Sequence, residues 1–344
     1  IPKDQPYLLL ESTLASRPNT GFLGILRLLS MNPEELYVTG FTFFVGGYDQ
    51  TYRQESESLV MDKMAKHGFH DQQAQLDYFI SNVVDEPALH CDDKLLEIVN
   101  DRLANRMPAS QPVSIIGNGP SLRPIDFRTL RSGLTVSFNR AYIVYKERNF
   151  YPTYYYCIDK AVLLACLEDI RNALNSPIKR FVLLDCLETK DLAKHDKVEL
   201  VKKTAESSTY FGDVATFSIW HLVCSGYKNF SVFGCDCSYV EDIDKLNVEV
   251  ETNEDDPARR IVLKPRKGSI DPNHFVPNYF CEGTEYSVPR EANHLKAWVS
   301  LAEFIKGREA NLTFRTVSNA SYLFDFKPYS PKVRAREITS MTDE

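Results

Sequence analysis

The chain has 344 residues, of which 43% are hydrophobic and 25% are charged, and its formal net charge is -7. The length suits two domains or one large domain with insertions, and the composition is that of a globular protein with a normal core. The acidic balance argues against a general nucleic-acid-binding protein, because phosphate contacts need a clustered basic surface.

The eight cysteines predict a cytoplasmic protein with reduced thiols, because they are scattered and mostly lie within apolar runs. Cys235 and Cys237 form a Cys-x-Cys pair, but no second pair or histidine at ligand spacing accompanies them, so we expect no zinc site. The sequence has no apolar run long enough to cross a membrane and no signal-peptide pattern at its start.

The N-terminal region predicts a loop, a helix and a strand. Residues 17–21 (Arg-Pro-Asn-Thr-Gly) form the loop, residues 22–29 have helical spacing, and residues 35–44 have the pattern of a buried strand. After a polar stretch, His70 precedes a predicted helix over residues 72–83.

The segment Ile-Ile-Gly-Asn-Gly-Pro-Ser-Leu at residues 115–122 is typical of a ligand-binding turn in an α/β protein. An apolar run ends at Gly117, and Ser121 is placed to cap a helix over residues 123–130. Such glycines let the backbone approach a ligand, and a helix N-terminus favours an anion. The spacing matches neither the G-x-G-x-x-G pattern nor a P-loop. Taken alone, the segment fits a nucleotide site or an ordinary strand-to-helix turn.

Two predicted strands that follow, over residues 134–138 and 154–158, end at Asn139 and Asp159. Ligands of doubly wound sheets bind at the carboxyl edge, where these side chains would touch a base or a ribose. In the alternative interpretation, the two residues cap the helices that follow.

The order of loop, helix and strand returns near residue 211. An apolar helix is predicted to residue 223 and a strand within residues 230–239, and when the two regions are aligned Arg17 falls at Phe211, Gly21 at Ala215 and Gly40 at Gly234. Each region is followed by a histidine and then by a helix. The two histidines are His70 and His274. This pattern favours a duplication whose first copy lacks its own glycine loop, although any two helix-strand units of an α/β protein look alike.

Polar and basic segments complete the chain. The acidic stretch over residues 240–256 predicts a mobile insertion, and a solvated loop without function is the simplest interpretation of its composition. The basic residues 259–260 and 264–267 suit an anionic acceptor or a membrane surface, and the tail over residues 329–344 is predicted to be loosely ordered. His221, Trp220 and Trp298 are expected in the core.

Taken in order, the loop over residues 117–122, the strands ending at Asn139 and Asp159, residues 234–239 and residues 271–280 resemble bacterial sialyltransferases with a single Rossmann-like domain. The related MptE-like bacterial proteins are still more similar, and the resemblance spans about residues 112–325. In the N-terminal region, the loop with Arg17, Thr20 and Gly21 resembles that family's Arg-x-Thr-Ser-Gly loop, residues 40–44 its Gly-x-Asp-Phe-Tyr strand end, and His70 its later histidine.

The resemblance implies a Rossmann-like α/β fold of GT-A-variant type, with a mainly parallel sheet flanked by helices. Residues 1–105 would be a partial module that an upstream segment or a partner chain completes, residues 106–328 a complete module, and residues 329–344 a tail. The implied reaction is inverting transfer of a nonulosonic or keto-sugar acid from a CMP-activated donor to a cell-surface glycan or glycolipid. No metal is required, and the protein would be cytoplasmic or peripheral to the inner membrane.

The resemblance also implies roles for residues. His274 would be the general base and Tyr239 would assist departure of the phosphate, with His70 at the equivalent place in the first module. A neutral imidazole suits proton abstraction, and hydrogen-bond donors suit a leaving phosphate. The implied nucleotide-binding residues are Gly117, Asn118, Gly119, Pro120, Ser121, Asn139, Asp159, Gly212 and Asp213, with Arg17, Thr20 and Gly21 in the first module.

Departures from the family leave alternatives open. Residues 211–215 lack the family's arginine and hydroxyl, and Phe44 stands where a tyrosine is expected, with Tyr48 and Tyr52 as replacements. His274 could be structural and Tyr239 could only pack. Under an MptE-like 6-hydroxymethylpterin diphosphokinase activity, ATP and magnesium would be used and a cluster of three aspartates would matter, namely Asp236, Asp242 and Asp244. A glycan-binding or scaffolding module with degenerate sites is the third hypothesis.

Overall fold

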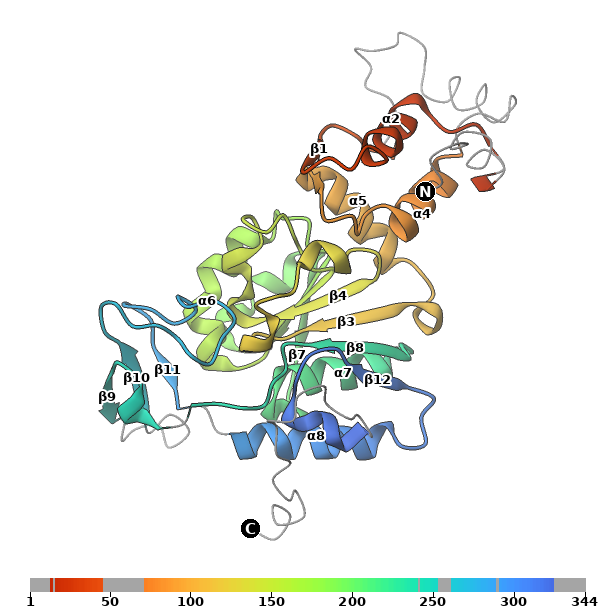
Figure 1. The fold of residues 1–344 in the computed structure, drawn as a ribbon. Coiled ribbons are helices and arrows are strands. Elements are labelled where there is room, and N and C mark those ends of the chain that lie inside the picture. The colour runs from red at the N-terminus through yellow and green to blue at the C-terminus, as the bar shows by residue number, and fades with distance from the viewer. Residues whose placement is uncertain are drawn as a thin grey trace.

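The computed structural model describes residues 13–14, 16–45, 71–240, 242–252, 261–288 and 291–324. Its centre is a sheet in which all neighbouring strands run parallel, and seven strands of the described chain form it (Figure 1). In spatial order these are β12 (Asn311–Phe314), β8 (Asn229–Phe233), β3 (Pro112–Ile116), β4 (Leu134–Phe138), β5 (Tyr154–Cys157), β6 (Arg180–Leu184) and β7 (Val198–Val201). The predicted Rossmann-like α/β fold is confirmed.

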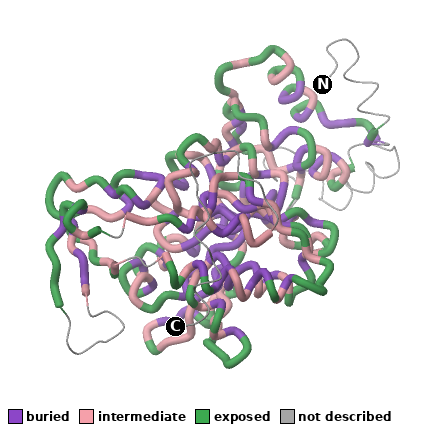
Figure 2. The backbone as a smooth tube through the Cα atoms, turned by 60° about the horizontal axis from the view of Figure 1, so that its bottom comes forward, coloured by how far each residue is buried: buried purple, intermediate pink, exposed green. Residues whose placement is uncertain are grey.

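The central strands are almost continuously apolar because helices cover both faces of the sheet. On one face, Val136 and Tyr156 pack with α7 (Val214–Cys224) and α8 (Glu291–Ile305). On the other face, Tyr155 pairs with Phe181 and packs against α6 (Lys160–Ala173). Figure 2 shows the buried residues gathered along this sheet at the centre of the molecule.

The strand order changes direction between β3 and β8. The chain adds β4 to β7 on one side of β3 and then returns through α7 to place β8 on the other side. In open α/β sheets, ligands bind outside the carboxyl ends of the strands at such a point. The glycine loop leaves β3 here and residues 234–239 leave β8 here, so the topology brings these two predicted segments together.

A smaller N-terminal unit packs on its own core (Figure 1). It comprises α2 (Thr20–Leu29), β1 (Leu36–Val38), α4 (Gln72–Asn82), β2 (Leu89–Cys91) and α5 (Asp93–Ala104), with β1 and β2 parallel. The predicted strand over residues 35–44 is wrong beyond Val38, because Gly40, Phe43 and Phe44 adopt positive φ angles that no extended strand accommodates. The predicted helices over residues 22–29 and 72–83 are confirmed as α2 and α4.

Asn149 joins the N-terminal unit to the main sheet domain. Its side chain donates to the carbonyl of Cys91 at 2.7 Å and accepts from the Cys91 amide at 3.0 Å. The buried guanidinium of Arg131 also donates to the carbonyl of Leu89 at 3.0 Å. Backbone groups of β2 therefore find partners in the main domain.

A small antiparallel sheet projects beside the main sheet (Figure 1). It consists of β9 (Val248–Thr252), β10 (Ile261–Pro265) and β11 (Tyr286–Ser287). Part of the predicted mobile insertion is therefore a paired strand, while residues 253–260 lie outside the described chain. Lys264 pairs with Glu251 at 2.8 Å and Glu285 at 3.1 Å, so these acidic neighbours already neutralise part of the predicted basic strip.

The core predictions hold for Trp298, which is fully buried, whereas Trp220 is partly buried. His221 retains 21% exposure and contacts the Tyr156 hydroxyl at 3.1 Å and Glu199 at 3.3 Å, so the prediction of a simple core residue is wrong. Polar groups of β5 and β7 reach its imidazole. His70, Tyr48, Tyr52 and the tail over residues 329–344 lie outside the described chain. Within the part that is described, no helix is both long and apolar enough to cross a bilayer.

Candidate functional site

The glycines of the loop after β3 allow two backbones to approach each other. A Cβ atom at Gly117 would lie 2.3 Å from the carbonyl oxygen of Gly234, so only glycine fits this position. The amide of Gly117 donates to Phe233 at 2.7 Å, and that of Gly119 donates to Gly234 at 2.7 Å. These glycines therefore close the ends of β3 and β8 onto each other.

The predicted helix over residues 123–130 is wrong, and so is its cap at Ser121. The chain instead forms two short 3₁₀ turns, Pro120–Leu122 and Phe127–Leu130. Asp126 starts a separate turn, because its side chain accepts from the Arg128 amide at 3.0 Å, and Pro124 has no amide donor with which to continue the first turn. The loop therefore has no α-helix dipole behind it.

Asp236, which follows β8, is hydrogen-bonded to this loop. Its carboxylate accepts from the Ser121 amide at 2.8 Å and contacts the Ser121 hydroxyl. A Cβ atom at Gly119 would lie 2.6 Å from the Asp236 carboxyl carbon. Burial raises the pKa of Asp236, and hydrogen bonds from Ser121 only partly offset that effect. A carboxyl group thus sits where the sequence predicted a phosphate.

Tyr279 connects the glycine loop to the end of β4. Its buried hydroxyl accepts from the side-chain amide of Asn118 at 2.9 Å and from the backbone amide of Arg140 at 3.1 Å. Its carbonyl accepts from the Arg140 guanidinium at 2.8 Å. Tyr279 therefore links the predicted site residue Asn118 to Arg140, which directly follows the predicted site residue Asn139.

Two amide oxygens at this edge lack partners. Within the described chain, the Oδ1 atoms of Asn118 and Asn139 are buried and make no hydrogen bond. Asn139 also adopts a φ of +52°, a left-handed conformation that asparagine tolerates better than most residues. Buried polar atoms are nearly always paired, so these oxygens mark a place where a ligand donor would be stabilising.

His274 forms a dyad with Asp271. Its Nδ1 atom lies 2.8 Å from Asp271 Oδ2, and Asp271 also accepts from the amides of Asn273 at 2.8 Å and Phe280 at 3.3 Å. The imidazole stacks on Tyr279 with 3.9 Å between ring centroids and 3° between planes. A carboxylate on Nδ1 fixes the ring so that Nε2 carries the lone pair, which is the arrangement of a general base.

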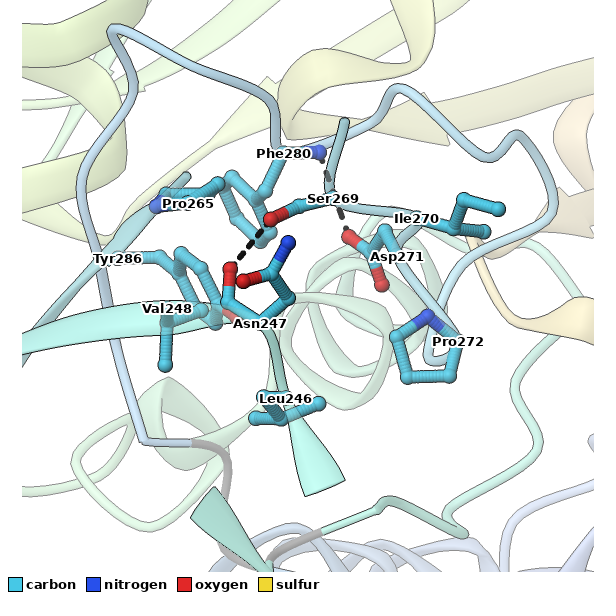
Figure 3. A pocket seen from close by; sticks show the side chains of 10 residues that line it. All are labelled: Leu246, Asn247, Val248, Pro265, Ser269, Ile270, Asp271, Pro272, Phe280 and Tyr286. Carbon is cyan, nitrogen blue, oxygen red and sulfur yellow. Dashed lines mark hydrogen bonds between the residues drawn. The ribbon is translucent and has the colours of Figure 1, made fainter. Parts of the chain in front are cut away.

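A shallow pocket opens beside the dyad (Figure 3). The turn with Ser269 and Asp271 forms one side, and Tyr286 and Phe280, whose rings stack at 4.2 Å, form another. Ser269 bonds the carbonyl of Asn247 across the pocket. Asp271 is the only charged side chain of this lining, and its two oxygens already bond Asn273, His274 and Phe280.

Tyr239 and Asp213 meet at His294, which the sequence did not single out. Asp213 caps α7 by accepting from the amides of Ala215 and Thr216, and its second oxygen lies 2.6 Å from His294 Nδ1. The His294 ring lies 5.0 Å from that of Tyr239. Burial raises the pKa of the Tyr239 hydroxyl, which keeps the phenol neutral. Gly212 lies in the turn before Asp213, beside the backbone of α8.

Other predicted nucleotide-binding residues lie at the starts of helices. Asp159 is exposed and caps α6 by accepting from two amides, which is the geometry of the capping alternative. Thr20 and Gly21 form the first turn of α2, and a Cβ at Gly21 would lie 2.7 Å from the Phe41 ring. With Arg17 they belong to the N-terminal unit rather than to the edge that carries Asn118.

The aspartates of the magnesium hypothesis are engaged separately. Asp236 faces Ser121, whereas Asp242 pairs with Lys245 at 3.0 Å. Among the described residues, no group of three or more potential ligands could hold a metal ion. All eight cysteines are unpaired, and burial raises the pKa of the Cys235 and Cys237 thiols.

Several residues of this edge were not predicted as site residues from the sequence. Asp271 could have been found, because it lies three residues before His274. Arg140 directly follows the predicted strand end, and its side chain helps to hold Tyr279. Asp236 was named only as a member of the aspartate cluster, and His294 gave no local signal, because each contacts a residue far away in the chain.

Comparisons with known proteins add little to this geometry. No protein-family model matches the chain, and no curated protein matches it. Among solved structures, the MAf glycosyltransferase from Magnetospirillum magneticum AMB-1 is 15% identical, with a TM-score of 0.33, over 83% of this chain and 43% of that protein. The chain thus spans less than half the length of that protein. At this TM-score, the likeness bears on neither the activity nor the substrate of this chain.

Proposed function

We propose that this protein is a glycosyltransferase that moves a nonulosonic or related keto-sugar acid from a CMP-activated donor to a hydroxyl of a glycan or glycolipid. One observation carries the proposal. Tyr279 holds the loop residue Asn118, the β4 end at Arg140 and the base candidate His274 in one cluster at the carboxyl edge of a Rossmann-like sheet. Residues of three separate segments converge there, as they do in an active site.

The nucleotide would bind at Asn118 and Asn139. Their unpaired amide oxygens need donors, which the amino group of a cytosine or the hydroxyls of a ribose supply. Arg123, which donates to the carbonyl of His274 at 3.1 Å, brings positive charge to the same edge. The Ser121 amide already donates to the Asp236 carboxylate. We therefore place the phosphate of the CMP-activated sugar outside the glycine loop and toward Tyr239.

The chemistry follows from the two ends of the site. His274 takes the proton of the acceptor hydroxyl on Nε2 while Asp271 holds Nδ1. The acceptor oxygen forms a bond to the anomeric carbon as the bond from that carbon to the phosphate oxygen breaks, and CMP leaves with the electron pair. The neutral Tyr239 hydroxyl donates a hydrogen bond to the leaving oxygen. We therefore place the acceptor hydroxyl at His274 Nε2, opposite the nitrogen that Asp271 holds.

Ligand-induced thermal shifts test the donor. We expect CMP and CMP-sugars to raise the unfolding temperature in EDTA, and we expect Asn139→Ala to abolish the shift. A response to ATP or GTP that needs magnesium would instead support a diphosphokinase. No response to any nucleotide would contradict both enzymes and leave a glycan-binding or scaffolding module.

Substitution of the base tests the mechanism. We expect His274→Ala to lower turnover by about 10²–10⁴-fold, the range for loss of a general base, with CMP affinity unchanged. His195→Ala is the matched control, because the imidazole of His195 bonds its neighbours Asp196 and Lys197 and lies outside the proposed site. Equal loss of folding and CMP binding in His274→Ala would show that the histidine is structural.

A further inference from the structure

Two segments of the chain have the same arrangement of elements. The N-terminal segment consists of α2, β1, α4 and β2, and the C-terminal segment consists of α7, β8, α8 and β12. In each, the two strands are parallel neighbours, β1 with β2 and β8 with β12. In each, the residue after the second strand donates its amide to the first strand, from Asp92 to Val38 at 3.1 Å and from Arg315 to Val232 at 2.8 Å.

The backbone angles agree where the sequence alignment pairs the segments. Gly40 has a φ of +66° and its counterpart Gly234 has +63°. Three residues later, Phe43 has +51° and Cys237 has +50°. Positive φ is uncommon for residues other than glycine, so its recurrence at the same offset shows that the two segments share one local design.

Each segment also has one polar link between its two helices. Asn19 caps α2 and its side-chain amide donates at 3.0 Å to Gln75, the fourth residue of α4. Asp213 caps α7 and contacts His294, the fourth residue of α8, at 2.6 Å. The N-terminal segment therefore shows that a neutral amide pair is enough to build this link.

We propose that Asp213 and His294 form a positioning pair that holds Tyr239 at the leaving-group end of the site. This inference rests on the proposed function. The pair replaces two amides with a carboxylate and an imidazole, whose hydrogen bond is stronger and more directional. His294 lies against the Tyr239 ring, whereas Val45 stands at the equivalent position of the N-terminal segment. Of the two segments, the ionisable pair thus occurs in the one that has a tyrosine at this position.

The surroundings suit this role. Asp213 lies near Cys235 and Cys237, which follow β8, and near Tyr239 itself. The amide of Val240 donates at 2.7 Å to the side chain of Asn273, the residue before His274. The side chain of Asn118 is held separately, because it donates to the carbonyl of Phe138 at 3.2 Å and to the Tyr279 hydroxyl at 2.9 Å. We therefore expect a shift of Tyr239 to change the leaving-group end and to leave the Asn118 end in place. Misplacement by about 1 Å at a reacting centre lowers rates by about a hundredfold.

The double variant Asp213→Asn with His294→Gln copies the amide pair of the N-terminal segment and tests the proposal. We expect it to fold, to bind CMP with unchanged affinity and to lose about a hundredfold in kcat. The single variant Asp213→Asn, which keeps His294, should have a higher rate than the double variant. The control is the reverse exchange, Asn19→Asp with Gln75→His, which should leave kcat unchanged. An unchanged kcat in the first double variant would overturn the proposal.

A second measurement separates this inference from the proposed function. A crystal structure of the double variant should show the Tyr239 ring displaced from its present place beside residue 294. If wild-type protein transfers no sugar, the proposed function fails, but an unmoved Tyr239 ring still decides against the pair and a displaced ring still supports it. Should the double variant lose its fold, His294→Gln, which keeps the capping carboxylate, carries the same test.

Discussion

The imidazole of His274 lies parallel to the ring of Tyr279, with 3.9 Å between centroids and 3° between planes. The hydroxyl of the same tyrosine accepts hydrogen bonds from Asn118 and from the Arg140 amide. One buried side chain therefore supports both the proposed base and the proposed nucleotide end. A change at Tyr279 is expected to act on either end according to which part of the side chain is removed.

Tyr279→Phe should weaken nucleotide binding while keeping the base in place. The variant removes the acceptor for Asn118 and Arg140 but retains the ring that stacks on His274. With a cost of about 1–1.5 kcal/mol for the lost bonds, we expect CMP affinity to fall about tenfold by calorimetry. Tyr227→Phe, which alters a hydroxyl that faces Tyr154, serves as the control. Unchanged CMP affinity would contradict the role of the hydroxyl.

Asp271→Asn should lower turnover without loss of nucleotide affinity. Asp271 uses one oxygen for the Asn273 amide and the other for His274 and Phe280, and an amide group cannot replace both oxygens as acceptors. The imidazole would then lose the partner that fixes its tautomer. We expect kcat to fall by at least about a hundredfold, in the range for a mispositioned base. Steady-state kinetics on saturating donor measure this, and a kcat equal to wild type would show that Asp271 is not needed.

The sequence predicted the fold well because its strongest signals are local. Apolar runs of 4–5 residues identified β3, β4 and β5, and the residues at their ends do lie at one edge of the sheet. The predicted helix over residues 123–130 was wrong because Asp126 caps a separate short turn, which helical spacing alone does not reveal.

The arrangement of the site could not be predicted in the same way. Ser121 bonds Asp236, which is 115 residues away, and Asn118 bonds Tyr279, which is 161 residues away. No spacing rule relates such partners, because their contact depends on how separate loops pack at the sheet edge. The glycine loop therefore predicted a turn at the end of β3 but gave no indication that the carboxyl group of Asp236 accepts hydrogen bonds from it.

Gly117→Ala should destabilise the protein, whereas Gly24→Ala should not. The new Cβ at position 117 would lie 2.3 Å from the backbone of Gly234, which cannot move without separating β3 from β8. We expect a loss of about 1–3 kcal/mol in the free energy of unfolding, as for other overpacked sites. Gly24 lies within α2 with nothing within 4 Å, so alanine there should gain about 0.5–1 kcal/mol. Chemical denaturation of both variants measures the difference, and equal stabilities would contradict the strand contact.

Asp236→Asn should change how stability depends on pH. Burial raises the pKa of Asp236 in the folded protein above its value of about 3.9 in the unfolded chain. A raised carboxyl pKa means that the folded state resists ionisation, so wild-type protein loses stability as the pH rises through the folded pKa. The asparagine variant has no such loss, and its amide oxygen can still accept from the Ser121 amide.

The stability of Asp236→Asn relative to wild type should therefore increase as the pH rises above about 4, the pKa of the unfolded chain. Asp242→Asn provides a control of opposite sign, because Lys245 lowers the pKa of Asp242 and removal of that carboxylate loses its stabilisation as the pH rises. The control effect should be small, since that pair is exposed. Guanidinium unfolding at several pH values measures all three proteins. If Asp236→Asn loses stability relative to wild type as the pH rises, the carboxylate is a favourable anion in the loop, and a phosphate could take its place there.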